Sequence, residues 1–121
     1  MKKAIFLDRD GTIIEERGHI KAADEVVFIN NVFASLGKLQ EHYELFIVTN
    51  QSGVAKKIIT NDDVENVNKY ILEVMQSYGI HITAVYVCPH DRADGCKCIK
   101  PKSFFLKKAE KEHNIDLRNS F

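Results

Sequence analysis

Short runs of continuous apolar residues occur at three places along the chain. They lie within residues 3–7, 44–49 and 82–88, and each ends at, or just before, a polar or chemically reactive residue. Runs of this kind are typical of parallel strands that are buried on both faces of a sheet. We therefore predict three strands in the interior of the molecule.

Apolar residues at helical spacing separate and follow these runs. Helices are predicted over residues 31–42, over 60–78 and from about 101 onward. In the second helix the predicted buried stripe consists of Val64, Val67, Ile71, Val74 and Tyr78. Thr60 and Asp63 form a capping-box pattern at its start, and Gly79 follows its end. The alternation of strands and helices predicts an α/β fold with a parallel sheet.

Composition limits the class of protein. The chain has 121 residues, which suits a single domain over residues 1–121, and 45% of them are apolar. Lys plus Arg and Asp plus Glu both number 17, so no basic field points to nucleic acid and no acidic excess points to disorder. No apolar run is long enough to cross a membrane. We expect a soluble, cytoplasmic domain that binds neither nucleic acid nor membrane.

Two carboxylates follow the first predicted strand directly. Asp8 and Asp10 are two residues apart, so an extended backbone places both on one side, and Gly11 permits a sharp turn after them. In different surroundings one carboxylate can stay ionised as a nucleophile or metal ligand while the other serves as an acid. The alternative is a simple turn at Asp10 with Asp8 as a cap. The preceding buried strand favours the catalytic interpretation, because ligands of parallel sheets bind beyond the carboxyl ends of strands.

A polar segment follows the second predicted strand. Thr49, Asn50 and Gln51 lie there, followed by a serine and a glycine. Their hydroxyl and amide groups, with the N–H groups of a turn, suit an oxyanion such as phosphate. A polar loop without a ligand is the alternative.

The third predicted strand ends in a cluster of potential metal ligands. Cys88 and His90 are followed by Cys96 and Cys98, and these include every cysteine of the chain. Three thiolates and an imidazole form a tetrahedral Cys3His set for Zn2+, which with four protein ligands is a structural site. In a reducing cytosol we expect free thiols rather than disulfides. Lys100 follows the cluster, where its cation can face a bound phosphate or a carboxylate.

Taken together, these motifs resemble the haloacid-dehalogenase-like phosphatases. The matching segments are FLDRDGT at 6–12, VTNQSG at 48–53, CPH at 88–90 and CKCIKPK at 96–102. The combination is most similar to the zinc-loop branch that holds histidinol-phosphate phosphatase and heptose-bisphosphate phosphatase. The resemblance implies a Rossmann-like three-layer sandwich without a large cap domain.

It also implies a Mg2+-dependent phosphomonoesterase acting on a small phosphorylated metabolite, of the histidinol phosphate or sugar bisphosphate class. Asp8 would attack phosphorus and form an aspartyl-phosphate, and Asp10 would serve as general acid and base. The Asp8 carboxylate and the Asp10 backbone carbonyl would bind Mg2+. Thr49, Asn50 and the neighbouring amide would hold the phosphoryl oxygens, and Lys100 would neutralise negative charge.

Several positions depart from the family pattern. Ile99 stands where an arginine is usual, and Ala55-Lys56-Lys57 replaces Ala-Arg-Gly, which leaves the leaving group of the substrate open. Residues 11–29, which we name the flap segment, show no strong period and are expected to form turns. Within it Gly18-His19 replaces Gly-Tyr, so His19 is either a substrate contact or a solvated histidine.

The family's fourth motif, a strand ending in Gly-Asp, would follow residue 121, so we expect a C-terminally truncated domain that lacks its last core strand. An exposed sheet edge is expected to result, through which the chain could form a homodimer. One alternative function is therefore a weakly active or inactive zinc-stabilised fragment that binds phosphate or dimerises. Another is a receiver-like module that is phosphorylated on Asp8.

Overall fold

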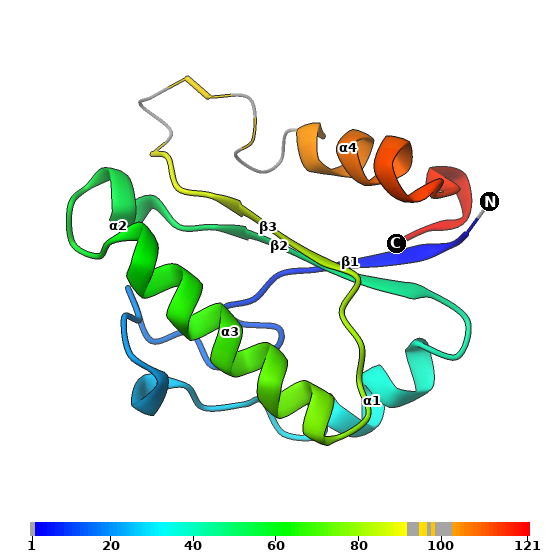
Figure 1. Cartoon of the computed structure of the whole chain (residues 1–121), viewed down its shortest axis with the longest axis horizontal. Coiled ribbons are helices and arrows are strands. Elements are labelled where there is room, and N and C mark those ends of the chain that lie inside the picture. The colour runs from blue at the N-terminus through cyan, green and yellow to red at the C-terminus, as the bar shows by residue number, and fades with distance from the viewer. Residues whose placement is uncertain (1, 92–94, 97, 99–102) are drawn as a thin grey trace.

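The computed structural model describes residues 2–91, 95–96, 98 and 103–121, and its elements alternate between strand and helix (Figure 1). The strands are β1 (Ala4–Leu7), β2 (Glu44–Asn50) and β3 (Ala84–Cys88). They pair in parallel in the order β1-β2-β3, so β2 is central. The helices are α1 (Val32–Leu39), α2 (Ser52–Ala55), α3 (Asn61–Ser77) and α4 (Phe104–His113), with 3-10 turns at Ala23–Glu25 and Leu117–Asn119. The prediction of an α/β fold with a parallel sheet is confirmed.

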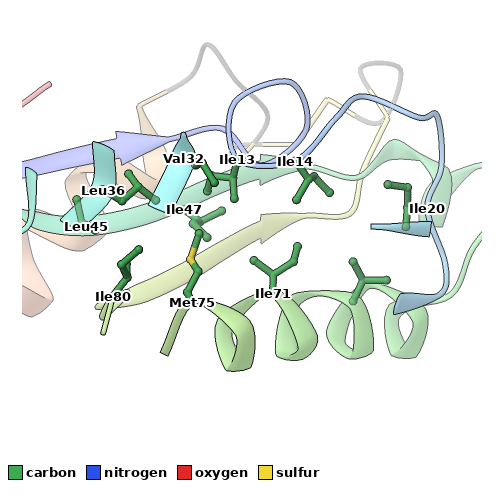
Figure 2. Packing of buried hydrophobic residues seen from close by; sticks show 11 residues of the cluster. Ile13, Ile14, Ile20, Val32, Leu36, Leu45, Ile47, Ile71, Met75 and Ile80 are labelled. Atoms are coloured by element: carbon green, nitrogen blue, oxygen red, sulfur yellow. The ribbon is translucent and has the colours of Figure 1, made fainter. Parts of the chain in front are cut away.

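Helices cover both faces of the sheet, which gives three layers. Figure 1 shows α4 on one side of the strands and α1 with α3 on the other. Successive residues of β2 point to opposite faces: Leu45 and Ile47 join the core beneath α1 and α3, whereas Phe46 and Val48 join the core beneath α4. Figure 2 shows the first of these cores, in which apolar side chains from β2, α1, α3 and the flap segment meet. The expected three-layer sandwich is therefore present.

Element boundaries differ slightly from the prediction. β1 and β3 begin at Ala4 and Ala84, and α1 ends at Leu39 instead of continuing to residue 42. The N–H groups of His42 and Tyr43 both donate to the Leu39 carbonyl, so the chain turns there rather than continuing the helix. Among the described residues, none of the helices combines the length and apolar character needed to cross a membrane.

Helix α3 begins as predicted, but the side chains that are buried in its last turn differ from the prediction. Thr60 and Asp63 form the capping box, with hydrogen bonds of 3.0 and 2.9 Å in the two directions. Met75 is completely buried, whereas Val74 is half-buried and Tyr78 is 63% exposed. The predicted stripe was wrong here because it ran past the end of the helix: Tyr78 is the C-cap and no longer has helical geometry.

The flap segment contributes more to the core than its sequence pattern indicated. Ile13, Ile14 and Ile20 are completely buried and belong to the cluster under α1 and α3. Ile14 also pairs with Phe28 in an antiparallel bridge, which closes the segment on itself. The segment is therefore anchored to the core at several points, although the 3-10 turn at Ala23–Glu25 and isolated bridges are its regular backbone structure.

The outer edge of β1 is covered by the last described residues. Ile115 pairs with Lys2 in parallel, and the Phe121 N–H donates to the Ala4 carbonyl at 2.9 Å. The Phe6 N–H in turn donates to the Phe121 carbonyl at 2.8 Å. The expectation of an exposed edge is therefore wrong along these residues, because the backbone groups of β1 find partners within the same chain.

Candidate functional site

Described residues of all three sequence motifs gather at the carboxyl ends of the three parallel strands. Asp8 follows β1, Asn50 is the last residue of β2, and Cys88 is the last residue of β3. Asn50 and Cys88 are direct partners in the strand register. Parallel pairing brings these ends to the same edge of the sheet, where sites of open α/β folds form.

Asp10 lies at this edge with both carboxylate oxygens engaged. Arg9 Nε donates to Asp10 Oδ2 at 3.1 Å, and a terminal Arg9 nitrogen donates to Asp10 Oδ1 at 3.2 Å. The other terminal nitrogen of Arg9 donates to Asn68 Oδ1 of α3 at 3.0 Å. Arg9 is only 1% exposed, so this guanidinium is a buried charge. A buried charge is tolerated only when it is paired and hydrogen-bonded, and both conditions are met here.

Gln51 connects the three strand ends. Its side-chain amide donates to Asp10 Oδ2 at 3.0 Å and to Thr49 Oγ1 at 2.8 Å. Its backbone N–H donates to the Cys88 carbonyl at 2.8 Å. Thr49 and Gln51 are 2% and 4% exposed, so these hydrogen bonds lie in a protected environment. The second polar motif is therefore built against the carboxylate motif on one side and the cysteine cluster on the other.

The remaining predicted site residues have different surroundings. Asp8 is exposed at the end of β1, and Asn50 is half-buried. An exposed carboxylate at this position is accessible to a ligand entering from solvent. Lys100 and its neighbour Ile99 lie outside the described residues.

The flap segment comes close to the polar segment that follows β2 through one histidine, His19. Gly53 is buried in α2, and a Cβ atom built on it would lie 2.6 Å from His19 Nδ1 and 2.9 Å from His19 Cγ. A side chain at position 53 would therefore occupy the space that the imidazole fills. The closeness of these two groups places His19 beside the polar segment at the end of β2.

The cysteine and histidine side chains converge as a tetrahedral metal site requires. The four candidate ligand atoms all lie within 4.8 Å of one another. Cys96 Sγ is 3.5 Å from Cys88 Sγ and 3.8 Å from Cys98 Sγ, and His90 Nδ1 is 3.7 and 3.4 Å from the same two sulfurs. Tetrahedral zinc with ordinary bond lengths separates its ligand atoms by roughly 3.5–3.8 Å. The donor set and these four spacings fit Zn2+, whereas Cys88 Sγ and Cys98 Sγ are bonded to each other and would have to separate before both could bind the ion.

One pair in this cluster differs from the prediction of free thiols. Cys88 and Cys98 form a disulfide, with Cα atoms 5.5 Å apart, and Cys96 is not part of this disulfide. That Cα separation is common for disulfides, and the zinc ligand spacing requires a similarly close approach. The same convergence of loops therefore serves either a disulfide or, with all three thiols reduced, a metal site.

The sequence analysis did not identify Arg9, which binds the Asp10 carboxylate, or Asn68, which binds Arg9. Two signals were available. Arg9 lies between Asp8 and Asp10, so an extended backbone directs its Cβ to the opposite side from theirs, toward the interior. Asn68 lies next to Val67 on the buried face of α3, where a polar side chain needs a partner. Neither signal identifies that the two residues bind each other.

The chain is similar to a family model and to several proteins of named activity. A family model described as polynucleotide kinase 3 phosphatase matches residues 3–121. D-glycero-beta-D-manno-heptose-1,7-bisphosphate 7-phosphatase of Helicobacter pylori is 36% identical over 121 residues, covering 98% of this chain and 70% of that protein. The histidine biosynthesis bifunctional protein HisB of Actinobacillus pleuropneumoniae is 34% identical over 120 residues, covering 97% of this chain and 33% of that protein.

A solved structure agrees with these relatives. The crystal structure of D,D-heptose 1,7-bisphosphate phosphatase from B. bronchiseptica, complexed with magnesium and phosphate, superposes with a TM-score of 0.86 at 26% identity. The superposition covers 97% of this chain and 66% of that structure. The present chain therefore spans roughly two thirds of the length of the heptose phosphatases that it matches.

Proposed function

Because the chain belongs to the haloacid-dehalogenase-like phosphatases, in the group of heptose bisphosphate phosphatases and HisB, we propose that it hydrolyses a phosphate monoester with Asp8 as the nucleophile. The observation that carries the proposal is the pair of carboxylates after β1. Asp8 is exposed to solvent, while Asp10 is held by Arg9 and Gln51 two residues further on. The two carboxylates therefore stand in different surroundings, as different catalytic roles require.

The reaction proceeds in two steps. In the first, an Asp8 carboxylate oxygen bonds to phosphorus, the bond from phosphorus to the ester oxygen breaks, and Asp10 gives its proton to the departing alkoxide. In the second, Asp10 takes a proton from water as the water oxygen attacks phosphorus, and the acyl phosphate bond breaks to release phosphate and restore Asp8. The protons balance, because Asp10 donates one and regains one.

The polar segment at the end of β2 holds the phosphoryl group in this proposal. Thr49 Oγ1 accepts the hydrogen bond from Gln51, so its own hydroxyl proton is available to a phosphoryl oxygen. Asn50 supplies a second donor, and Gln51 keeps both Thr49 and Asp10 in place. Lys100 is proposed to neutralise the charge that Asp8 and the phosphate bring together.

The surroundings of Asp10 fit the magnesium ligation expected for this family. Asp10 Oδ2 accepts from both Arg9 and Gln51, whereas Oδ1 accepts from Arg9 alone and so keeps a position for the proton of the acid. The Asp10 backbone carbonyl is then the group proposed to bind the metal, next to the Asp8 carboxylate. Both are oxygen donors, which Mg2+ prefers. When bound, Mg2+ would offset the repulsion between an anionic nucleophile and an anionic phosphate.

We further propose a structural Zn2+ held by Cys88, His90, Cys96 and Cys98, which fixes the loop after β3. Four protein ligands leave no coordination position for substrate, so this ion would stabilise the loop without taking part in the reaction. The proposed substrate is a small phosphorylated metabolite of the heptose bisphosphate or histidinol phosphate class. Support comes from the named activities of the relatives and from the phosphate in the solved structure.

The test is turnover of a panel of phosphate esters with Mg2+ by the parent chain, Asp8→Asn and Asp24→Asn. Asp24 is an exposed acid in the flap segment and serves as the matched control. We expect turnover by the parent and the control, and a loss of at least about a thousand-fold in Asp8→Asn, because no other group replaces the nucleophile. Equal rates in parent and Asp8→Asn would refute the proposal. Binding of inorganic phosphate without turnover by the parent would instead identify a phosphate-binding module.

A further inference from the structure

Arg9 occupies an unusual position for an arginine. It lies between the two carboxylates in sequence, yet its side chain is 1% exposed and points into the protein rather than toward a ligand. Its Nε and one terminal nitrogen donate to the two oxygens of Asp10, at 3.1 and 3.2 Å. This forked contact fixes the plane of the carboxylate as well as its distance, which a single hydrogen bond does not.

Asn68 holds the far side of the same guanidinium. It is 9% exposed, lies in the middle of the 17-residue helix α3, and accepts from Arg9 at 3.0 Å. Its neighbours Val67 and Ile71 are buried in the core under the sheet. The anchor is therefore part of a helix that is itself firmly packed, and not a mobile surface group.

Gln51 restrains Asp10 from the other direction. Its amide donates to Asp10 Oδ2 at 3.0 Å, the same oxygen that Arg9 Nε contacts. The carboxylate is thus held from α3 through Arg9 and from the end of β2 through Gln51. Both restraints would have to loosen before the carboxylate could change its orientation.

A purely stabilising role explains this arrangement poorly. A buried ion pair adds little net stability, because desolvation of the two charges offsets their attraction. Orientation of a catalytic group, in contrast, has a large effect on rate, since misplacement by about 1 Å costs on the order of a hundred-fold.

We propose that Arg9 is a positioning residue, which, anchored by Asn68, aims the Asp10 carboxylate at the oxygen of the leaving alcohol. This inference rests on the proposed phosphatase function. It gives a role to Arg9 and Asn68, neither of which contacts substrate or metal in the proposed reaction. The step concerned is the transfer of the Asp10 proton to the ester oxygen as the bond from phosphorus to that oxygen breaks. An alkoxide leaving group depends on this proton, whereas p-nitrophenolate, a weak base, leaves without it.

The test uses Asn68, because loss of the buried guanidinium itself risks unfolding the chain. kcat is measured for glycerol 2-phosphate and for p-nitrophenyl phosphate in the parent, Asn68→Ala and the control Asn66→Ala. Asn66 lies on the same helix but is exposed. In Asn68→Ala we expect kcat for glycerol 2-phosphate to fall about 10- to 100-fold and kcat for p-nitrophenyl phosphate to fall less than about three-fold. Asn66→Ala should match the parent with both substrates.

Rescue separates positioning from damage to the fold. Asn68→Asp keeps an acceptor for Arg9 in the same place, so it should recover most of the rate with glycerol 2-phosphate. An equal loss with both substrates, or no loss with either, overturns the inference.

If the parent hydrolyses no ester of the panel described above, the proposed function fails; if it hydrolyses neither of these two esters, the network is tested by urea unfolding. The single variants Asn68→Ala and Asp10→Asn are compared with the double variant. A non-additive shift of the unfolding midpoint supports the positioning network without reference to activity. Additive shifts overturn it.

Discussion

The contact between the flap segment and α2 leads to a quantitative prediction about Gly53. In Gly53→Ala the new Cβ would lie 2.6 Å from His19 Nδ1, 2.9 Å from His19 Cγ and 3.2 Å from Ile59 Cγ1. Carbon atoms in ordinary contact are about 3.5–4.0 Å apart, so the methyl group overlaps the imidazole by up to about 1 Å. The His19 ring would have to leave its place, which is the larger disturbance, whereas the buried Ile59 has to shift by only a few tenths of an ångström.

Two opposing contributions set the size of the effect. Overpacking costs about 1–3 kcal/mol, and replacement of glycine by alanine in a helix gains at most about 1 kcal/mol. We therefore expect Gly53→Ala to lower the free energy of unfolding by about 1 kcal/mol. In a His19→Ala background the main obstacle is gone, so the same substitution should be neutral or slightly stabilising. The two substitutions should thus couple by about 1–2 kcal/mol.

The measurement is urea unfolding followed by circular dichroism. With a slope of about 2 kcal/mol per molar, typical of a chain this size, Gly53→Ala should lower the midpoint by about 0.5 M. Gly37→Ala in α1 is the matched control, because a Cβ there meets nothing within 4 Å, and it should raise the midpoint. If Gly53→Ala lowers the midpoint equally in the parent and in the His19→Ala background, the imidazole does not fill the space next to Gly53, and the reasoning is wrong.

Two further predictions concern the metal cluster and the pH dependence of stability. Cys96→Ser keeps Cys88 and Cys98 but should lose the zinc that the reduced parent binds. Zinc at a hundred times its Kd should stabilise the parent against thermal unfolding by about 3 kcal/mol, and the variant should lack this stabilisation. Metal analysis with a chelator titration checks this, and an undiminished zinc content in the variant would contradict it. The hydrogen bond from the Thr83 hydroxyl, aided by Lys2, holds the pKa of Glu44 below its usual value of 4.5, so its stabilisation is present above that pH and is lost as the pH falls through the lowered pKa. Thr83→Val should therefore cost about 1 kcal/mol at pH 7 and progressively less toward pH 3, whereas Thr83→Ser should follow the parent; a cost that does not change with pH would show that the carboxylate is not involved.

The local pattern of the chain predicted most of the fold. Strand and helix positions followed from apolar runs and helical spacing, because burial on a sheet or against it imposes those periods on the sequence. The capping box at Thr60 was also predictable, since both partners lie within one helical turn. The exposure of Tyr78 was not, because the spacing alone does not show where the helix stops.

The candidate site was predicted as a set of residues but not as a network. The motifs at Asp8 and Asp10, at Thr49 to Gln51 and at the cysteines were visible, because each is contiguous or nearly so. That they meet at one edge followed from parallel pairing of the strands. The pairing of Cys88 with Cys98 differed from the expected free thiols, because residue spacing shows which sulfurs can approach but not which of them bond.

The sequence by itself therefore determined the order of elements, the family motifs and the residues proposed to carry the chemistry, since these depend on short-range spacing. Only the tertiary structure decided that Arg9 reaches Asn68, which is 59 positions away, and that His19 fills the space over Gly53. It also decided that Phe121 pairs with the outer edge of β1. The physical reason is that partners distant in sequence are selected by the packing of the whole chain, where each buried polar group must find a partner and each volume must be filled once.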